Sequence, residues 1–101
     1  MATIDAELEI AQKALEALNT LSSPTVDEAI GTLRRVREEA RRAMITVLSS
    51  EEGLINARHD VDIKFGDLIR ALQQGSFAPD KIESARRAVE DWITELKALE
   101  V

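Results

Sequence analysis

The stretch GLINARHDVDIKFGDLIRALQQG, residues 53–75, decides the fold class. Its apolar residues recur at steps of three and four, which is the spacing of one face of an α-helix. The residues on that face are Leu54, Ala57, Val61, Phe65, Leu68 and Leu72. Gly75, which closes the stretch, can adopt the left-handed backbone conformation that often ends a helix. The pattern therefore predicts an amphipathic helix over residues 51–74.

Three further segments carry the same helical spacing, and none alternates in the way a strand does. Pro24 ends the first segment, because proline disfavours helical geometry in the residue before it. Pro79 suits the first position of the last helix, where Asp80 and Glu83 lie near the positive end of the helix dipole. The predicted helices cover residues 3–21, 26–48, 51–74 and 79–100.

Two short patterns predict where the middle helices begin. Thr25 with Glu28, and Ser49 with Glu52, have the spacing of a capping box, in which the two side chains satisfy amide groups at a helix start. The second pattern predicts a break between the second and third helices. A single kinked helix is the alternative.

Four amphipathic helices joined by short connections predict an all-α protein, an antiparallel up-and-down four-helix bundle that forms one domain over residues 1–101. The first segment has an unusually wide apolar face made of two rows. One row is Ile4, Leu8, Ala11, Leu15 and Leu18, and the other is Ile10, Ala14, Ala17 and Leu21. That width leaves open a core completed by dimerisation.

Composition excludes several classes of function. The 101 residues include no cysteine, so disulfides, thiolate zinc sites and thiol catalysis are excluded. No apolar run is long enough to span a membrane, and no export leader precedes the first helix, so we expect a cytoplasmic protein. The net charge of −6 repels phosphate backbones and disfavours nucleic acid as a partner.

The second segment is the one mildly basic surface, with five arginines and four acidic residues. Pairs four residues apart, such as Glu38 with Arg42, predict a solvated, ion-paired face. Arg37 lies about 40° from Leu33 around the helix, at the edge of the apolar stripe. We expect its guanidinium to reach an acidic side chain on a neighbouring helix. An anion contact made by Arg37 and Arg41 is the alternative.

His59 is the single histidine, so any phosphotransfer or general-base chemistry would pass through it. It lies two residues from Val61, the centre of the buried stripe, and so about 160° away around the helix. We therefore expect His59 to be exposed. The residues predicted to share its outward side as a docking surface are Ile55, Ile63, Gly66 and Arg70.

An exposed imidazole on a helix of an acidic four-helix bundle resembles the histidine phosphotransfer proteins. The resemblance implies that His59 accepts a phosphoryl group. That family places lysine three and glycine four residues after the histidine, where this chain has Asp62 and Ile63. Lys64 and Gly66 lie further on, and the neighbouring aspartates would repel an acidic receiver domain.

The segments 37–39 and 64–69 resemble two parts of the magnesium-binding pattern of MazG-type nucleotide pyrophosphohydrolases. The resemblance would make Glu39 and Asp67 metal ligands. Two further acids of that pattern are replaced here by Arg42 and Lys64, which leaves too few oxygen ligands for magnesium. We therefore expect no metal site and no cofactor.

The sequence thus predicts a small helical-bundle protein without catalysis, which acts by binding another protein or itself, as a homodimer. Histidine phosphotransfer through His59 and a degenerate MazG-like hydrolase are the alternatives. Trp92 and Phe65, two of the three aromatic residues, lie on inward stripes and are predicted to anchor the core.

Overall fold

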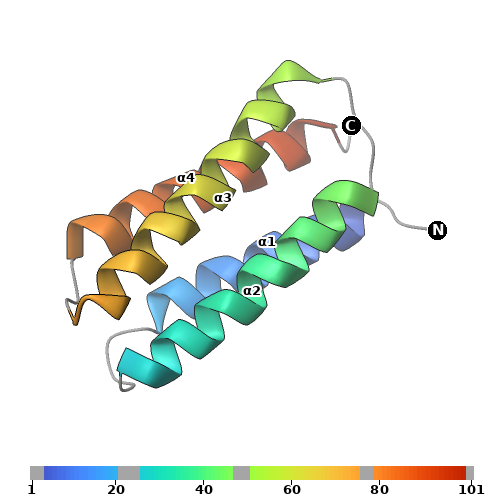
Figure 1. The fold of residues 1–101 in the computed structure, drawn as a ribbon. Coiled ribbons are helices and arrows are strands. Elements are labelled where there is room, and N and C mark those ends of the chain that lie inside the picture. Colours follow the sequence, from blue (N-terminus) through green and yellow to red (C-terminus); the bar gives the residue numbers. More distant parts are fainter. Residues whose placement is uncertain (1–3, 21–25, 47–50, 76–78, 100–101) are drawn as a thin grey trace.

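The computed structural model is an antiparallel bundle of four helices (Figure 1). They are α1 (Ile4–Asn19), α2 (Val26–Thr46), α3 (Glu52–Gln73) and α4 (Pro79–Leu99). The structure describes residues 4–20, 26–46, 51–75 and 79–99. Each helix packs against its neighbours in a closed ring, because α4 also contacts α1. The up-and-down bundle predicted from the sequence is confirmed, and its extents are 41 × 23 × 18 Å.

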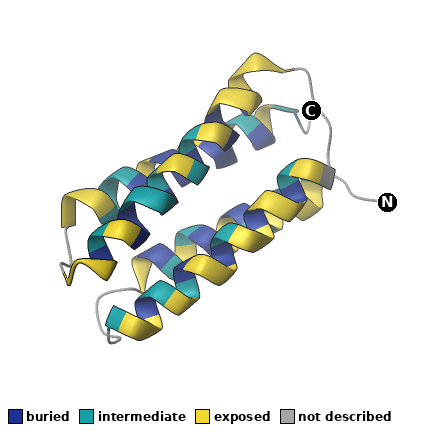
Figure 2. Cartoon of the chain, viewed as in Figure 1, coloured by how far each residue is buried: buried dark blue, intermediate teal, exposed yellow. Residues whose placement is uncertain are grey.

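The core runs along the axis of this bundle, where the four buried faces meet (Figure 2). Trp92 and Phe65 are fully buried, so both aromatic anchors are confirmed. Every residue of the stripe predicted for α3 is also buried, and Val89 and Leu96 of α4 belong to the same core cluster.

The apolar face of α1 is centred between its two predicted rows. The buried residues are Glu7, Ala11, Ala14 and Leu18, and the larger residues Ile4, Leu8, Ile10 and Leu15 pack at the margins of the core. Alanines at the centre let α1 approach α2 and α4 closely. The bundle itself therefore accounts for the width of this face.

The starts of α2 at Val26 and α4 at Pro79 agree with the sequence prediction, and the other helix ends differ from it by one or two residues. α1 ends at Asn19, and the Thr20 hydroxyl donates to the carbonyl oxygens of Glu16 and Ala17 at 3.2 and 3.1 Å. Gly75 has φ +83° and its N–H donates to the Leu72 oxygen at 2.9 Å, so the predicted glycine terminator is confirmed.

α2 and α3 are separate helices. The backbone of Glu51 is extended, with φ −68° and ψ 115°, and α3 begins at Glu52. Glu52 is thus the first residue of the helix, whereas a capping box needs it at the third position. Ser49 and Thr25, which the two predicted boxes would use, lie outside the described residues.

Candidate functional site

The surface of interest surrounds His59, which is exposed on α3 as predicted. Among the described residues, three large apolar side chains are exposed, namely Ile45 at 75%, Ile55 at 47% and Ile63 at 43%. Ile55 and Ile63 lie one helical turn before and after His59, on the same side of α3. We call Ile45, Ile55, His59 and Ile63 together the His59 face.

Ile45 comes from α2 and joins this face across the groove between α2 and α3. A concavity of about 370 Å³ is lined there by Arg41, Met44, Ile45, Arg58, His59 and Asp62. Ile45 and His59 therefore lie at the same level of two antiparallel helices. The isoleucine of α2 was absent from the docking surface predicted from the sequence, because no pattern in one segment shows which residues of another segment lie beside it.

A carboxylate held by two arginines forms the border of the face. Asp62 Oδ1 accepts from Arg37 Nε at 3.0 Å and from Arg41 Nε at 2.8 Å, and both guanidiniums come from α2. The hydrogen bond from Arg41, joined by those from Arg37, holds the pKa of Asp62 below its usual range, and the same contact raises the pKa of Arg41. The expected reach of Arg37 to a neighbouring helix is confirmed.

Gly66 lies beneath the Arg37 side chain. A methyl group placed on Gly66 would stand 3.0 Å from Arg37 Nη2, so the absent side chain leaves room for the guanidinium to approach Asp62. Gly66 is half-buried and contributes less to the outward surface than its helical position predicts. Arg70, one turn further on, is exposed as predicted.

The other side of His59 is acidic. A concavity of about 550 Å³ between α3 and α4 is lined by Gly53, Asn56, Ala57, His59, Asp60, Asp91, Thr94 and Glu95. The Glu95 carboxylate lies over Gly53 in the first turn of α3, near the positive end of that helix dipole. Three carboxylates and no lysine or arginine line this groove, so it opposes the approach of a phosphoryl group to His59.

Beneath the face lies a buried polar cluster that was not predicted from the sequence. Glu7 of α1 is fully buried and accepts from Arg58 Nε at 2.9 Å and from Arg58 Nη2 at 2.5 Å. Its Oε2 also accepts from Trp92 Nε1 at 2.7 Å. The signal in the sequence was the position of Glu7 in line with Ala11, Ala14 and Leu18, but a single acidic residue in such a row is easily taken for the solvated edge.

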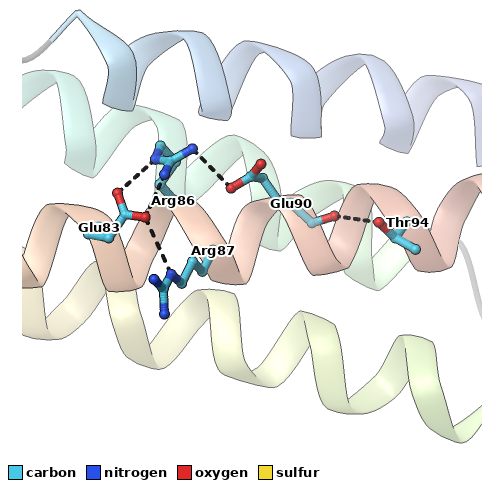
Figure 3. A network of polar contacts seen from close by, with 5 residues as sticks. All are labelled: Glu83, Arg86, Arg87, Glu90 and Thr94. Atoms are coloured by element: carbon cyan, nitrogen blue, oxygen red, sulfur yellow. Dashed lines mark hydrogen bonds and ion pairs between the residues drawn. The ribbon is translucent and has the colours of Figure 1, made fainter.

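A second charged network lies on α4. Arg86 Nη1 donates to Glu90 at 3.1 Å, and Glu83 accepts from Arg86 Nε at 2.9 Å and from Arg87 Nε at 3.3 Å (Figure 3). The Arg86 hydrogen bond lowers the pKa of Glu83. These side chains satisfy one another along their own helix, so the network is a solvated surface and adds nothing to the His59 face.

The segments that resemble the MazG pattern lie on adjacent helices, α2 and α3. Glu39 is exposed and Asp67 is half-buried. Within the described ranges no three histidine or acidic side chains are grouped in a way that could hold a metal ion. The position expected to supply a third acid carries Lys64, whose ammonium group cannot ligate magnesium.

Comparison with models of protein families, with curated proteins and with solved structures finds no match for this chain. In the part of the chain that the structure describes, no helix combines the length and the apolar character needed to cross a membrane.

Proposed function

We propose that the protein is a non-catalytic binding module whose docking surface is the His59 face. One observation carries the proposal. The three exposed large apolar side chains of the described residues all gather around one residue, on two adjacent helices. Single exposed apolar residues are ordinary on any surface, whereas a group of them beside a charged rim is typical of a protein contact.

The charged border of the His59 face suits binding better than catalysis. Asp62, Arg37 and Arg41 are already engaged with one another, so they form a fixed polar border and do not supply a reactive group. Thr94 is the one hydroxyl residue among those that line the two concavities with His59. Its hydroxyl donates to the Glu90 carbonyl oxygen of its own helix at 3.0 Å, and not to His59, so the hydrogen bond from nucleophile to base that activates a hydroxyl is not formed in these linings.

The test is a pair of variants with equal added charge. Ile55→Glu/Ile63→Glu places two carboxylates on the face, and Ala6→Glu/Gln12→Glu adds the same charge at exposed positions of α1. Light scattering and affinity capture should show association for the wild type and the α1 control, and loss of it for the α3 variant. Circular dichroism checks that both variants fold.

Equal association of the α3 variant and the wild type would contradict the proposal. A wild-type chain that stays monomeric and retains no partner would also contradict it.

Histidine phosphotransfer through His59 is the second candidate, and the exposure of the imidazole favours it. Incubation with phosphoramidate would then give an acid-labile phosphate on the wild type and none on His59→Ala, measured by intact-protein mass spectrometry. The acidic groove beside His59 argues for the opposite result, an unlabelled wild type.

A further inference from the structure

We propose that the occupant of the His59 face is a second copy of this chain, with the two α3 helices antiparallel and the two His59 side chains adjacent on a two-fold axis. This inference rests on the proposed function and names its partner. The arrangement follows from the spacing of the apolar residues, the distribution of charge along α3, and the position of Ile45.

The spacing is symmetric about His59. Ile55 precedes it by four residues and Ile63 follows it by four, so each lies about 6 Å from it along the helix axis, in opposite directions. Two antiparallel α3 helices that cross at His59 therefore place Ile55 of each copy opposite Ile63 of the other. The exposed fractions of these two isoleucines are 47% and 43%. Each therefore has apolar surface that the contact can bury.

Charge along α3 selects the antiparallel direction. Glu52 and Arg70 are exposed, and they lie seven residues before and eleven residues after His59, both within about 20° of it around the helix. Antiparallel pairing brings the acidic end of one α3 toward the basic end of the other. Parallel pairing would place Glu52 beside Glu52 and Arg70 beside Arg70 and would align the two helix dipoles.

The position of Ile45 fits the same axis. A two-fold axis perpendicular to α3 at the level of His59 also relates the two α2 helices. Because Ile45 lies level with His59 across the groove, its counterpart in the second copy comes to the same level. Ile45, the most exposed of the large apolar side chains of the described residues, is then covered by its own symmetry mate.

The side of the bundle is large enough for a stable contact. This side is 41 Å long and between 18 and 23 Å wide. The product of its length and width is of the order of the ~800 Å² per partner that standard interfaces bury. An unrelated protein would need its own matching arrangement of apolar and charged groups. A second copy supplies that arrangement through symmetry alone.

Cysteine cross-linking tests the arrangement directly, because the chain has no cysteine of its own. A disulfide needs Cα atoms within about 7 Å. His59→Cys should therefore cross-link to itself under mild oxidation, on the order of tenfold faster than the exposed α1 control Gln12→Cys, because a dimer holds the two thiols at an effective millimolar concentration. Dimers are measured on non-reducing gels.

Two further variants fix the direction. Ile55→Cys and Ile63→Cys, mixed in equal amounts, should give mainly the mixed dimer, because like positions lie about 12 Å apart along the axis in the antiparallel arrangement. Homodimers of each variant without the mixed species would indicate parallel helices and overturn the inference.

The outcomes separate this inference from the proposed function. If His59→Cys cross-links no faster than Gln12→Cys while Ile55→Glu/Ile63→Glu still abolishes association, the face binds something else, and only the dimer arrangement is wrong. If that glutamate variant associates as the wild type does, the dimer arrangement and the proposed function are both wrong.

Discussion

At the scale of single residues, Glu7 decides how α1 is held. Its carboxylate is fully buried and bound by Arg58 and Trp92, which come from two other helices. Removal of one partner from a buried pair leaves an uncompensated charge, at a cost of about 3–5 kcal/mol, although replacement of both partners costs far less. The cluster therefore fixes the position of α1 against α3 and α4 more than it adds to net stability.

This predicts a strong coupling between Glu7 and Arg58. Glu7→Gln and Arg58→Met should each lower the free energy of unfolding by about 3 kcal/mol, and the double variant should lose less than the sum of the two, by about 1–3 kcal/mol. Gln at position 7 still offers an oxygen to Trp92 Nε1. Urea denaturation measures all four chains, and strict additivity would contradict the contacts seen between the two side chains.

Asp62 makes the stability dependent on pH in the acid range. Hydrogen bonds from Arg41 and Arg37 lower its folded pKa below 3.8, so the folded chain favours the ionised form. The stability it contributes is present above about pH 4 and is lost as the pH falls through the lower folded pKa. At neutral pH, Asp62→Asn should cost about 1 kcal/mol.

The difference in the free energy of unfolding between wild type and Asp62→Asn should shrink toward zero as the pH is lowered below 3.8. Urea denaturation at several pH values measures it. A difference that stays constant down to pH 2 would show that the carboxylate charge plays no part.

At the scale of the helix, two glycines in similar helical positions should respond differently to alanine. Gly31 lies exposed in α2 with open space around its missing Cβ, so Gly31→Ala should raise the free energy of unfolding by about 0.5–1 kcal/mol. Gly66→Ala should gain less, because the new methyl group meets Arg37 and moves it from Asp62. Thermal denaturation compares the two.

The same substitutions in an Arg37→Ala background provide the control. Without the guanidinium, Gly31→Ala and Gly66→Ala should raise the free energy of unfolding by equal amounts. A Gly66→Ala gain that already matches Gly31→Ala in the wild type would show that Arg37 moves aside without cost.

The helices themselves were predictable because their information is local. Apolar residues at steps of three and four located all four, and Gly75 and Pro79 marked ends that the structure confirms. The same periodicity placed His59 on the exposed side of α3 and Arg37 at the core edge. These inferences use only the angle between residues of one helix.

Relations between helices were not predictable in this way. Ile45 joins the His59 face, and Glu7 meets Arg58 fifty-one residues away, only because of the register between antiparallel partners. Periodicity determines which side of a helix turns inward, but not how far each helix slides along its neighbour. The buried Glu7 also breaks the rule that a carboxylate indicates solvent, which holds unless a cationic partner is buried with it.

At the scale of the whole molecule, charge opposes the association that the His59 face favours. Two chains of net charge −6 whose centres are 18 Å apart, the smallest extent of the bundle, would repel each other by about 8 kcal/mol in water without salt. Two exposed ion pairs between Glu52 and Arg70 would each stabilise the dimer by at most about 1 kcal/mol. Repulsion is therefore the larger electrostatic effect between the copies.

Salt should thus strengthen the dimer. The Debye length falls to about 10 Å at 0.1 M ionic strength, below the separation of the two centres, so screening removes most of the repulsion and leaves the apolar contact nearly unchanged. The dimer dissociation constant, measured by analytical ultracentrifugation, should fall between low salt and 0.15 M sodium chloride. Ile55→Glu should show a steeper fall, because its added charges lie at the contact. A dissociation constant that rises with salt would mean that ion pairs hold the copies together, and the apolar face would then not be the source of affinity.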